Sequence, residues 1–365
     1  MNVSSEFCYE DKIQYNISHV WSAGSAMGLT HLQWIAWNVS GYTLLSSGVL
    51  LNFIVIFTFS TNKTVQNWGL SSIYSLAICD FINCWILIFQ KGPMTDEIKG
   101  NDVLHALDCK LFRSYYLFWA LSANSTAHLL MVLYQRYRLL ISNTKFERSS
   151  TLRNLFFCWS VGFLLMSYRM VFFKIVKDNN GKYHCVLQWT CSWMKSLFPM
   201  LEFCFMIVLP LLMMLYCTLK ISSFVWRLRK VYSLLNPESN PHLITSIHTS
   251  IVISIFFIVV IFVVTWIPSY IYYILYGFSV YQDFRGLFYN MSFILIIVNF
   301  SINPILYSFA LPHFRKSFKA TMQYTFCLVF KQKLKIEARV SHSVTNEEHF
   351  DRLIIKTISG NSSNF

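Results

Sequence analysis

Residues 300–307 read Phe-Ser-Ile-Asn-Pro-Ile-Leu-Tyr and close the last long apolar run of the chain. In a membrane, Pro304 removes a helix hydrogen bond and frees backbone groups that then need other partners. Ser301 and Asn303 add polar side chains at the same depth, where polar groups face the interior of a helix bundle. The stretch therefore predicts a transmembrane helix that packs against several others.

The composition is that of a membrane protein. The 365-residue chain is 55% hydrophobic and 13% charged, whereas soluble domains carry about 25% charged residues. A spanning helix needs about 20 predominantly apolar residues. We therefore expect an all-α membrane protein, a seven-transmembrane helix bundle with spans at about 41–61, 69–90, 110–138, 153–175, 194–222, 247–276 and 286–309.

The positive charge is distributed unevenly over this topology. The net charge is +13, and Lys and Arg concentrate in the first loop, at the end of the third span and after the fifth and seventh spans. Because positive residues favour the cytoplasmic side, we expect these regions inside the cell and the N-terminus outside a plasma membrane. Membrane topology therefore explains the charge, and we expect no nucleic acid as a partner.

This topology divides the chain into four parts. We expect an extracellular tail over 1–40, a transmembrane domain over 41–310, an amphipathic eighth helix over 311–327 and a cytoplasmic tail over 328–365. The sequons at Asn2 and Asn16 are predicted glycosylation sites in the extracellular tail.

Residues 303–307 resemble the Asn-Pro-x-x-Tyr motif of the rhodopsin-like (class A) G-protein-coupled receptors. Further residues resemble this family at the expected places in other spans: Asn52, Asp80, Trp159, Pro210, Trp266 and Pro268. The resemblance covers roughly residues 40–325. It implies a receptor that transmits an extracellular ligand signal to a heterotrimeric G protein.

The third span ends in Gln135-Arg136-Tyr137 where the family has Asp-Arg-Tyr. The resemblance implies that Arg136 contacts the G protein, although an arginine at this place could also extend to lipid phosphate. The acid that restrains the arginine is replaced by Gln135, and residues 246–248 at the start of the sixth span offer no acid either. We therefore expect a weakened inactive state and raised basal activity. The resemblance implies switching or coupling roles for Arg136, Tyr137, Pro210, Trp266, Pro268, Asn303, Pro304 and Tyr307.

Asp80 is an acid in the middle of the second span, which predicts a functional site because burying a carboxylate is costly. In the family, the corresponding Asp binds a sodium ion, and the resemblance implies the ligands Asp80, Ser125, Asn299 and Asn303. Carboxylate, hydroxyl and amide oxygens suit a hard cation. The alternative is a protonated Asp80 that is hydrogen-bonded to Asn303 without an ion. We expect no other cofactor.

The cysteines suggest an extracellular disulfide. The resemblance implies a bridge from Cys109 to Cys185, with Cys191 as the alternative partner, and Cys191 could instead pair with Cys8. The interval from Cys109 to Arg136 is slightly longer than the family's usual one. The resemblance therefore fixes pocket positions on the third helix only to within a residue or two.

The ligand pocket is expected at the outer ends of the helices. Amine receptors place an Asp on the outer third of the third helix, but residues 116–122 contain no acid. The region from the fifth to the seventh helix loosely resembles histamine receptors, through Glu202 and the offset of Tyr216 from Pro210. Glu202 either pairs with Arg169 or meets a cationic ligand. The predicted pocket residues are Phe118, Trp119, Ser122, Glu202, Tyr270, Tyr273 and Phe293, which suit a peptide, a lipid or a small aromatic compound.

The C-terminal region predicts further partners. Phe314 and Phe318 lie four residues apart among basic residues, as in an amphipathic helix on the surface of membrane lipids. Cys327 is a palmitoylation candidate. Phosphorylation of Ser and Thr in the polar tail would add charge that arrestin-type proteins read; the alternative is an unmodified tail.

Three alternatives to a signalling receptor can be considered from the sequence. A channel or transporter is disfavoured because the sequence has no inverted repeat. A non-signalling decoy or a constitutively active receptor is suggested by Gln135. An enzyme is not expected, since the sequence shows no nucleophile–base pair or metal cluster.

Overall fold

The computed structural model describes residues 30–61, 70–91, 102–142, 147–177, 183–235, 242–280, 287–310, 319–321 and 323. The chain divides into two units, Met1–Arg315 and Lys316–Phe365. The described residues of the second unit are helical. The glycosylation residues Asn2 and Asn16, the lipidation residue Cys327 and the Ser/Thr-rich tail lie outside the described residues, as does most of the predicted eighth helix.

Seven helical segments of the described chain are long and apolar enough to cross a membrane. They are His31–Thr61, Ser71–Gln90, Asp102–Ile141, Arg148–Phe172, Trp193–Leu228, Val252–Gly277 and Leu287–Leu306. The predicted seven-helix bundle is thus confirmed, and the chain is a multi-pass membrane protein. The first helix begins at His31, earlier than the expected start of the first span near residue 41.

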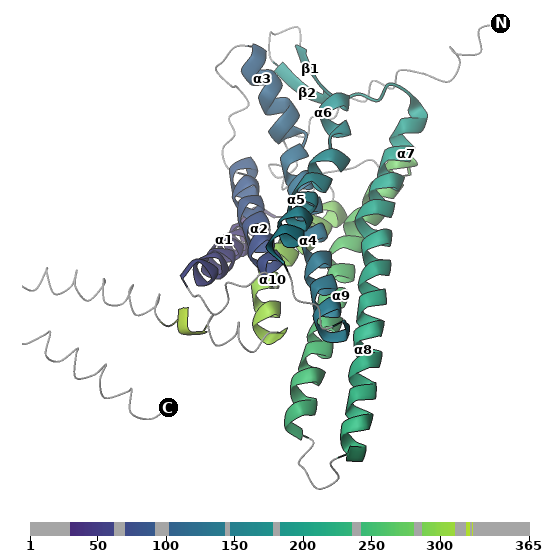
Figure 1. Ribbon diagram of the computed structural model, residues 1–365. Coiled ribbons are helices and arrows are strands. Elements are labelled where there is room, and N and C mark those ends of the chain that lie inside the picture. The colour runs from purple at the N-terminus through teal and green to yellow at the C-terminus, as the bar shows by residue number, and fades with distance from the viewer. Residues whose placement is uncertain are drawn as a thin grey trace, which may run out of the picture. The chain divides into compact units, whose positions relative to one another are not determined.

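The described elements of the first unit follow one another through the bundle (Figure 1). The helices are α1 (His31–Thr61), α2 (Ser71–Lys91), α3 (Asp102–Asp108), α4 (Tyr116–Ile141), α5 (Arg148–Leu165), α6 (Tyr168–Phe172), α7 (Ser192–Phe203), α8 (Leu209–Leu235), α9 (His242–Gly277) and α10 (Leu287–Ala310). Two π-helical turns, Cys109–Arg113 and Cys204–Val208, join α3 to α4 and α7 to α8.

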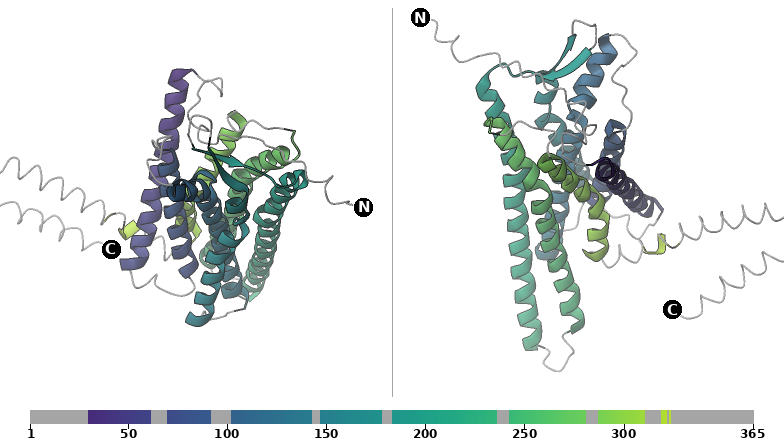
Figure 2. Two further views of the ribbon diagram at one scale, coloured as in Figure 1. Left: turned by 90° about the horizontal axis from the view of Figure 1, so that it is seen from above. Right: turned by 180° about the vertical axis from the view of Figure 1, so that it is seen from behind.

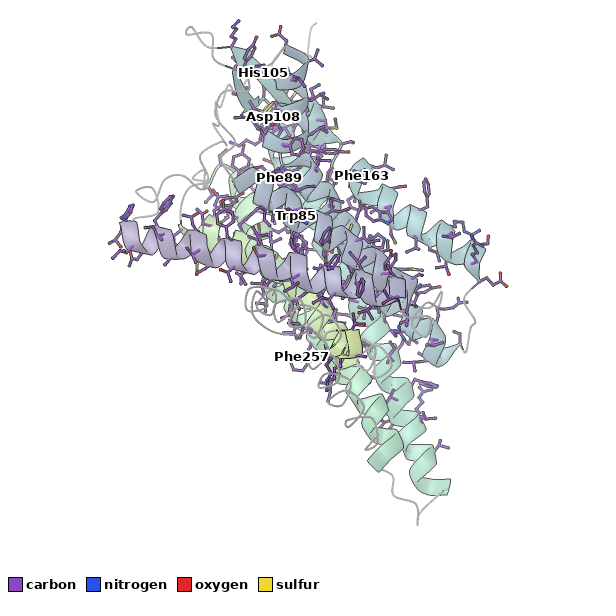
Figure 3. The ribbon with its side chains drawn as sticks, turned by 90° about the vertical axis from the view of Figure 1, so that its left-hand side faces the viewer. Trp85, Phe89, His105, Asp108, Phe163 and Phe257 are labelled. Carbon is purple, nitrogen blue, oxygen red and sulfur yellow. A yellow bond between two sulfur atoms is a disulfide. The ribbon has the colours of Figure 1, made fainter. Side chains whose placement is uncertain are left out.

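Helix α4 lies at the centre of the packing. It contacts α2, α5 and α8, while α9 contacts α7, α8 and α10, and α10 returns to α1 (Figure 2). Phe118 and Trp119 on α4 are almost completely buried. On the outside of the bundle, α2 and α9 expose apolar side chains such as Trp85, Phe89 and Phe257 (Figure 3). Such a surface suits lipid rather than water.

The α4–α5 contact depends on a glycine. A Cβ atom on Gly162 would collide with the Ala120 carbonyl and the Asn124 side chain. With no side chain in the way, the Gly162 N–H donates a 2.7 Å hydrogen bond to Asn124 Oδ1. Close approach of two backbones through a small residue is typical of membrane helices.

The third span is irregular near its outer end. Residues Cys109–Arg113 form a π-helical turn, and Tyr115 adopts a left-handed conformation with φ 56° before α4 begins. A π-helical turn takes up more residues per turn than an α-helix. This irregularity lies within the interval from Cys109 to Arg136.

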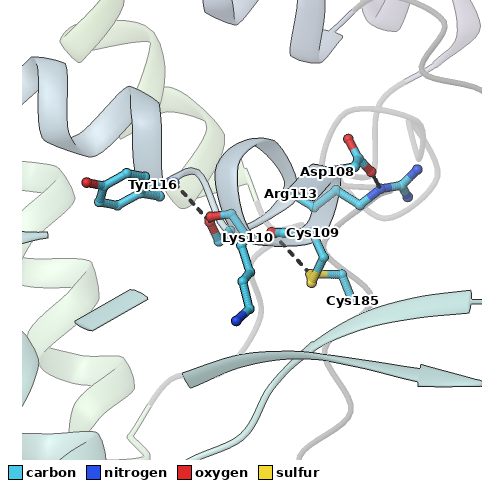
Figure 4. Close-up of a disulfide and its surroundings, with 7 residues drawn as sticks. Asp108, Cys109, Lys110, Arg113, Tyr116 and Cys185 are labelled. Carbon is cyan, nitrogen blue, oxygen red and sulfur yellow. Dashed lines mark hydrogen bonds and ion pairs between the residues drawn. A yellow bond between two sulfur atoms is a disulfide. The ribbon is translucent and has the colours of Figure 1, made fainter. Parts of the chain in front are cut away.

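The hairpin β1 (Phe173–Lys177) and β2 (Tyr183–Leu187) lies between the fourth and fifth spans. The strands are antiparallel, with Phe173 opposite Leu187. A disulfide joins Cys185 of β2 to Cys109 (Figure 4), which confirms the first of the two predicted pairings. Cys191 is also disulfide-bonded; its suggested pairing with Cys8 stays a prediction, because Cys8 lies outside the described residues. We call the hairpin end of the bundle the outer end, and the Arg136 end the inner end.

The fourth span runs from Arg148 to Phe172, so it begins and ends earlier than the expected segment 153–175. Helix α5 stops at Leu165, a turn follows at Met166 and Ser167, and the short helix α6 leads into β1 at Phe173. The sequence did not reveal this break, because an apolar run does not distinguish one continuous helix from a broken helix and the apolar strand that follows it. The break places Tyr168 and Arg169 together on α6, facing the fifth span.

Candidate functional site

A cavity of about 60 Å³ lies at the outer end of the bundle. Since a buried water needs about 10–15 Å³ of such space, the cavity has room for roughly five waters or one small ligand group. Three of the predicted pocket residues line it, namely Trp119, Glu202 and Tyr273. The lining also includes Tyr276, and five aromatic residues that the sequence did not single out: Tyr115, Tyr168, Phe173, Trp189 and Tyr289.

The charged groups of the cavity are one ion pair. Arg169 Nη2 lies 2.8 Å from Glu202 Oε1 and 3.2 Å from Oε2, and Arg169 Nε lies 3.3 Å from Oε1. Tyr168 donates its hydroxyl to the same carboxylate. Both charged residues are buried, at 8% and 6% exposed. Of the two roles considered for Glu202, the structure shows the pairing with Arg169.

Aromatic rings surround the arginine. The Arg169 guanidinium carbon lies 5.2 Å from the Trp119 ring centroid, 5.5 Å from that of Tyr168 and 5.9 Å from that of Tyr273. A desolvated cation over aromatic faces gains about 2 kcal/mol or more. The rings therefore hold the guanidinium in place independently of its carboxylate.

The other predicted pocket residues pack against the cavity wall without lining it. Phe118 and Phe293 stack with ring centroids 5.2 Å apart, and Tyr270 lies 6.2 Å from Trp119. Ser122 accepts a hydrogen bond from Asn83 and donates to the Phe118 carbonyl. They form the layer that supports the cavity residues.

A chain of rings leads from the cavity to Trp266. Trp119 lies 6.4 Å from Trp266, centroid to centroid, and Trp266 lies 6.2 Å from Phe300. Pro268, two residues after Trp266, lies inside α9. A proline removes a helix hydrogen bond, so α9 can bend at this place. A displacement of Trp119 would therefore act on the Trp266 ring, two residues before Pro268.

Asp80 lies in the middle of the bundle and is completely buried. It accepts hydrogen bonds from Ser125 at 2.6 Å and from Asn303 at 2.8 Å. The Asn299 side-chain amide donates instead to Thr265, at 3.0 Å. Within the described ranges, Asp80 forms no ion pair with Lys, Arg or His. A cation or a proton must balance its charge, and the oxygen atoms of Asp80 and Ser125 suit a sodium ion.

Asn52 connects this region to the first helix. Its amide donates to the Phe300 carbonyl at 3.0 Å and to the Gly48 carbonyl at 2.9 Å. Phe300 lies four residues before Pro304, which frees that carbonyl from its usual helix partner. The Asn52 amide thus provides the hydrogen bond that the Phe300 carbonyl lacks because of Pro304.

At the inner end, Arg136 has no partner for its buried Nε atom in the part of the chain that the structure describes. Gln135 is 2% exposed, and its amide nitrogen is also unpaired there. The Tyr137 ring lies 6.1 Å from that of Tyr216, which is 53% exposed. Tyr307 lies in α10, and its side chain is outside the described set. No carboxylate holds Arg136 among the described residues.

Comparison with known proteins agrees with this architecture. Residues 51–307 match the family "7 transmembrane receptor (rhodopsin family)". The chain belongs to this receptor family. It is 23% identical over 295 residues to galanin receptor type 1 of Rattus norvegicus, covering 78% of this chain and 81% of the relative. It is 23% identical over 296 residues to neuropeptide Y receptor type 4 of Mus musculus, covering 77% of each.

The family membership explains the arrangement of the receptor. A rhodopsin-family receptor binds an extracellular ligand and passes the signal to a G protein, and this chain is such a G-protein-coupled receptor. The cavity and the ring chain occupy the outer half of the bundle, whereas Arg136 lies at the inner end. Asp80 lies between them.

The receptor also uses residues that sequence reasoning missed. Tyr168 and Trp189 line the cavity, and Tyr115 enters it from the irregular part of the third span. A tyrosine or tryptophan near a membrane boundary has no distinctive pattern, because such residues are common there. His128 bridges Ser75 and the Asn124 carbonyl at 2.8 and 2.7 Å, and Trp159 donates to the same serine. These contacts fix α2, α4 and α5 together.

On the outer surface, the hairpin is tied to α3. The Tyr183 ring stacks on His105 with centroids 4.2 Å apart, and Tyr183 donates its hydroxyl to Asp102. The hydrogen bond to this carboxylate raises the pKa of Tyr183. Together with the disulfide, these contacts hold β2 above the third span.

Proposed function

We propose that the chain is a plasma-membrane receptor with its N-terminus outside, and that its ligand is a peptide. The named relatives are receptors for galanin and neuropeptide Y, which are peptides. The small cavity supports this proposal, because it can take one side chain or terminus while the rest of a peptide stays above it. The lack of an acid in residues 116–122 argues against an amine ligand.

The observation that carries the proposal is the ring chain from Trp119 to Trp266. A ligand that contacts Trp119 would act through it on Trp266, which lies two residues before Pro268 in α9. It shifts the bundle toward an active state only through its higher affinity for that state. A movement of α9 would then open the inner end around Arg136 for a G protein.

We propose a sodium ion as an allosteric ligand of Asp80 and Ser125. The support is the buried carboxylate that lacks a cationic partner within the described residues. The ion would supply positive charge to the inactive bundle, where Asp80 and Ser125 would hold it and Asn303 would orient the carboxylate.

We also propose that this receptor signals without ligand. In an inactive receptor, an acid beside the arginine keeps it away from the G protein, and here Gln135 replaces that acid. The unpaired Nε atom of Arg136 supports this idea. The C-terminal tail, when phosphorylated, would recruit arrestin-type proteins, and the helix after Tyr307 would lie on membrane lipids.

The test is basal activation of each G-protein family in cells at matched surface density. Wild type should activate at least one family above untransfected cells, and Arg136→Ala should abolish that signal. Arg138→Ala is the matched control, because Arg138 packs on Tyr134 and should leave most of the signal. A wild type that is at the surface and silent in every family would contradict the proposal and favour a decoy receptor.

A further inference from the structure

The chemistry of the outer cavity constrains the part of the ligand that enters it. Most of the side chains that line the cavity are aromatic, and its charged groups are Arg169 and Glu202. Aromatic walls favour a ring, which packs edge-to-face or offset against other rings. The polar atoms that remain free in the walls then decide what else the entering group carries.

Glu202 is already paired. Its Oε1 atom accepts hydrogen bonds from Tyr168 and from Nε and Nη2 of Arg169, and its Oε2 atom accepts from Nη2. A cationic ligand would have to displace a guanidinium that the rings of Trp119 and Tyr273 also hold. The displaced Arg169 would then be a buried, unpaired charge, which is strongly unfavourable. A cation is therefore excluded from this place.

Two donors on residues that line the cavity have no acceptor among the described residues. Arg169 uses Nε and Nη2 for Glu202, and its Nη1 atom makes no hydrogen bond within the described chain. Trp189 lines the same cavity, is 4% exposed, and has no partner for its indole N–H among the described residues. A buried donor without an acceptor, such as the Trp189 N–H, is unfavourable and is normally satisfied. A ligand that brings an acceptor would satisfy them.

The charge balance distinguishes a neutral acceptor from an anion. Arg169 and Glu202 cancel each other, so a ligand carboxylate would leave a second negative charge close to Glu202 in a desolvated site. Like charges at such a place are mutually unfavourable. A carbonyl oxygen accepts from the same N–H groups without adding charge.

We propose that this cavity binds an uncharged carbonyl group attached to an aromatic ring, with the oxygen accepting from Arg169 Nη1 and Trp189 Nε1. The proposal rests on the receptor function above and names the chemistry that its ligand carries into the cavity. It is consistent with the pairing of Glu202 with Arg169, the first of the two roles considered for Glu202 in the sequence. The carbonyl belongs to the ligand's inserted end, and the ring fills the aromatic walls.

Three matched probes test the proposal: 3-phenylpropanamide, 3-phenylpropanoate and 3-phenylpropylamine. They share the ring and chain and differ in carrying a neutral acceptor, an anion or a cation. Their dissociation constants are measured by ligand-observed NMR on the purified full-length receptor in detergent micelles. We expect the amide to bind at least tenfold more tightly than the amine and more tightly than the carboxylate.

Variants locate the probe. Trp189→Phe removes the indole N–H and keeps a ring, so it should weaken amide binding about fivefold, the worth of one neutral hydrogen bond. Trp193→Phe is the matched control, because Trp193 is half exposed and does not line the cavity. It should leave the affinity unchanged. If Trp189→Phe does not fold, the ranking of the probes on wild type decides alone.

The opposite ranking overturns the proposal. Tightest binding of the amine or the carboxylate, binding of none of the probes, or equal loss in both tryptophan variants would each contradict it. These results are independent of the receptor function. If the receptor activates G proteins through Arg136 but fails the probe test, only the carbonyl-site proposal is contradicted. If the receptor binds the amide but activates no G protein, only the signalling proposal is contradicted.

Discussion

The outer and inner ends of the bundle each carry an arginine whose Nε atom is buried or paired, and the surroundings of the two are opposite. Arg169 at the outer end has a carboxylate, a tyrosine hydroxyl on that carboxylate, and three aromatic rings. Arg136 at the inner end has an uncharged neighbour, Gln135, and an unpaired buried Nε atom within the described chain. Asp80, midway, has two neutral donors.

This difference separates two uses of a buried charge. A charge with a complete set of partners fixes one arrangement of the helices, because every alternative leaves something unpaired. A charge without partners is available for a new contact. The outer end is therefore built to hold a shape that a ligand recognises, and the inner end to change its contacts when a G protein binds.

Breaking the outer pair should have a large effect on stability. Glu202→Gln leaves Arg169 buried and unpaired, which costs about 3–5 kcal/mol. The melting temperature of the purified receptor should fall by on the order of 10 °C. The double variant Arg169→Gln with Glu202→Gln should recover part of the loss, while Glu147→Gln, at an exposed position, should change nothing. An unchanged melting temperature for Glu202→Gln would show that the pair does not form.

The middle of the bundle should respond to sodium. With the ion at about tenfold its dissociation constant, binding stabilises the receptor by about 1.4 kcal/mol. Melting in sodium chloride should therefore occur a few degrees higher than in N-methylglucamine chloride of equal ionic strength. Asp80→Asn should remove this difference.

The hydroxyl ligand is tested with paired serine variants. Ser125→Ala should reduce the sodium effect, whereas Ser72→Ala, which removes a buried hydroxyl without a partner among the described residues, should keep it. Equal sodium effects in wild type and Asp80→Asn would contradict the proposal that Asp80 binds a sodium ion.

A smaller effect is expected from the tyrosine on the outer pair. Tyr168→Phe deletes one donor to Glu202 and leaves the bonds from Arg169 intact. Loss of a hydrogen bond to a charged group should cost about 1.5–3 kcal/mol. Tyr116→Phe is the neutral counterpart, since Tyr116 donates to the Phe163 carbonyl at 3.2 Å, and should cost about 1 kcal/mol. Thermal melting of both variants would compare them; equal losses would mean that Glu202 gains nothing from Tyr168.

Much of the fold followed from local sequence. Apolar runs of spanning length predicted the seven helices, and the polar residues Asn52, Asp80 and Asn303 inside those runs predicted an interior where they meet. Asp80 and Asn303 do form a hydrogen bond, although 223 residues separate them. Such predictions succeed because polar groups in a membrane have few other places to go.

The cavity was harder to predict. Arg169 and Glu202 could each be noticed, but their pairing depends on the break between α5 and α6, which an apolar run conceals. The left-handed Tyr115 and the adjacent π-helical turn lie next to Cys109, whose disulfide to Cys185 is a long-range constraint that local preference does not reveal. Trp189 lines the cavity only because of where the folded loop places it, and the sequence does not predict the conformation of that loop.

The most direct measurement is the ligand-free rate of nucleotide exchange on a purified G protein, with the receptor in lipid nanodiscs. Gln135→Asp places a carboxylate beside Arg136, and Gln135→Asn makes a similar change of size without charge. We predict that Gln135→Asp lowers the exchange rate at least fivefold, a coupling free energy of about 1 kcal/mol, and that Gln135→Asn leaves it near the wild-type rate. Equal rates for the two variants would contradict the view that the inner arginine is free because it lacks an acidic partner.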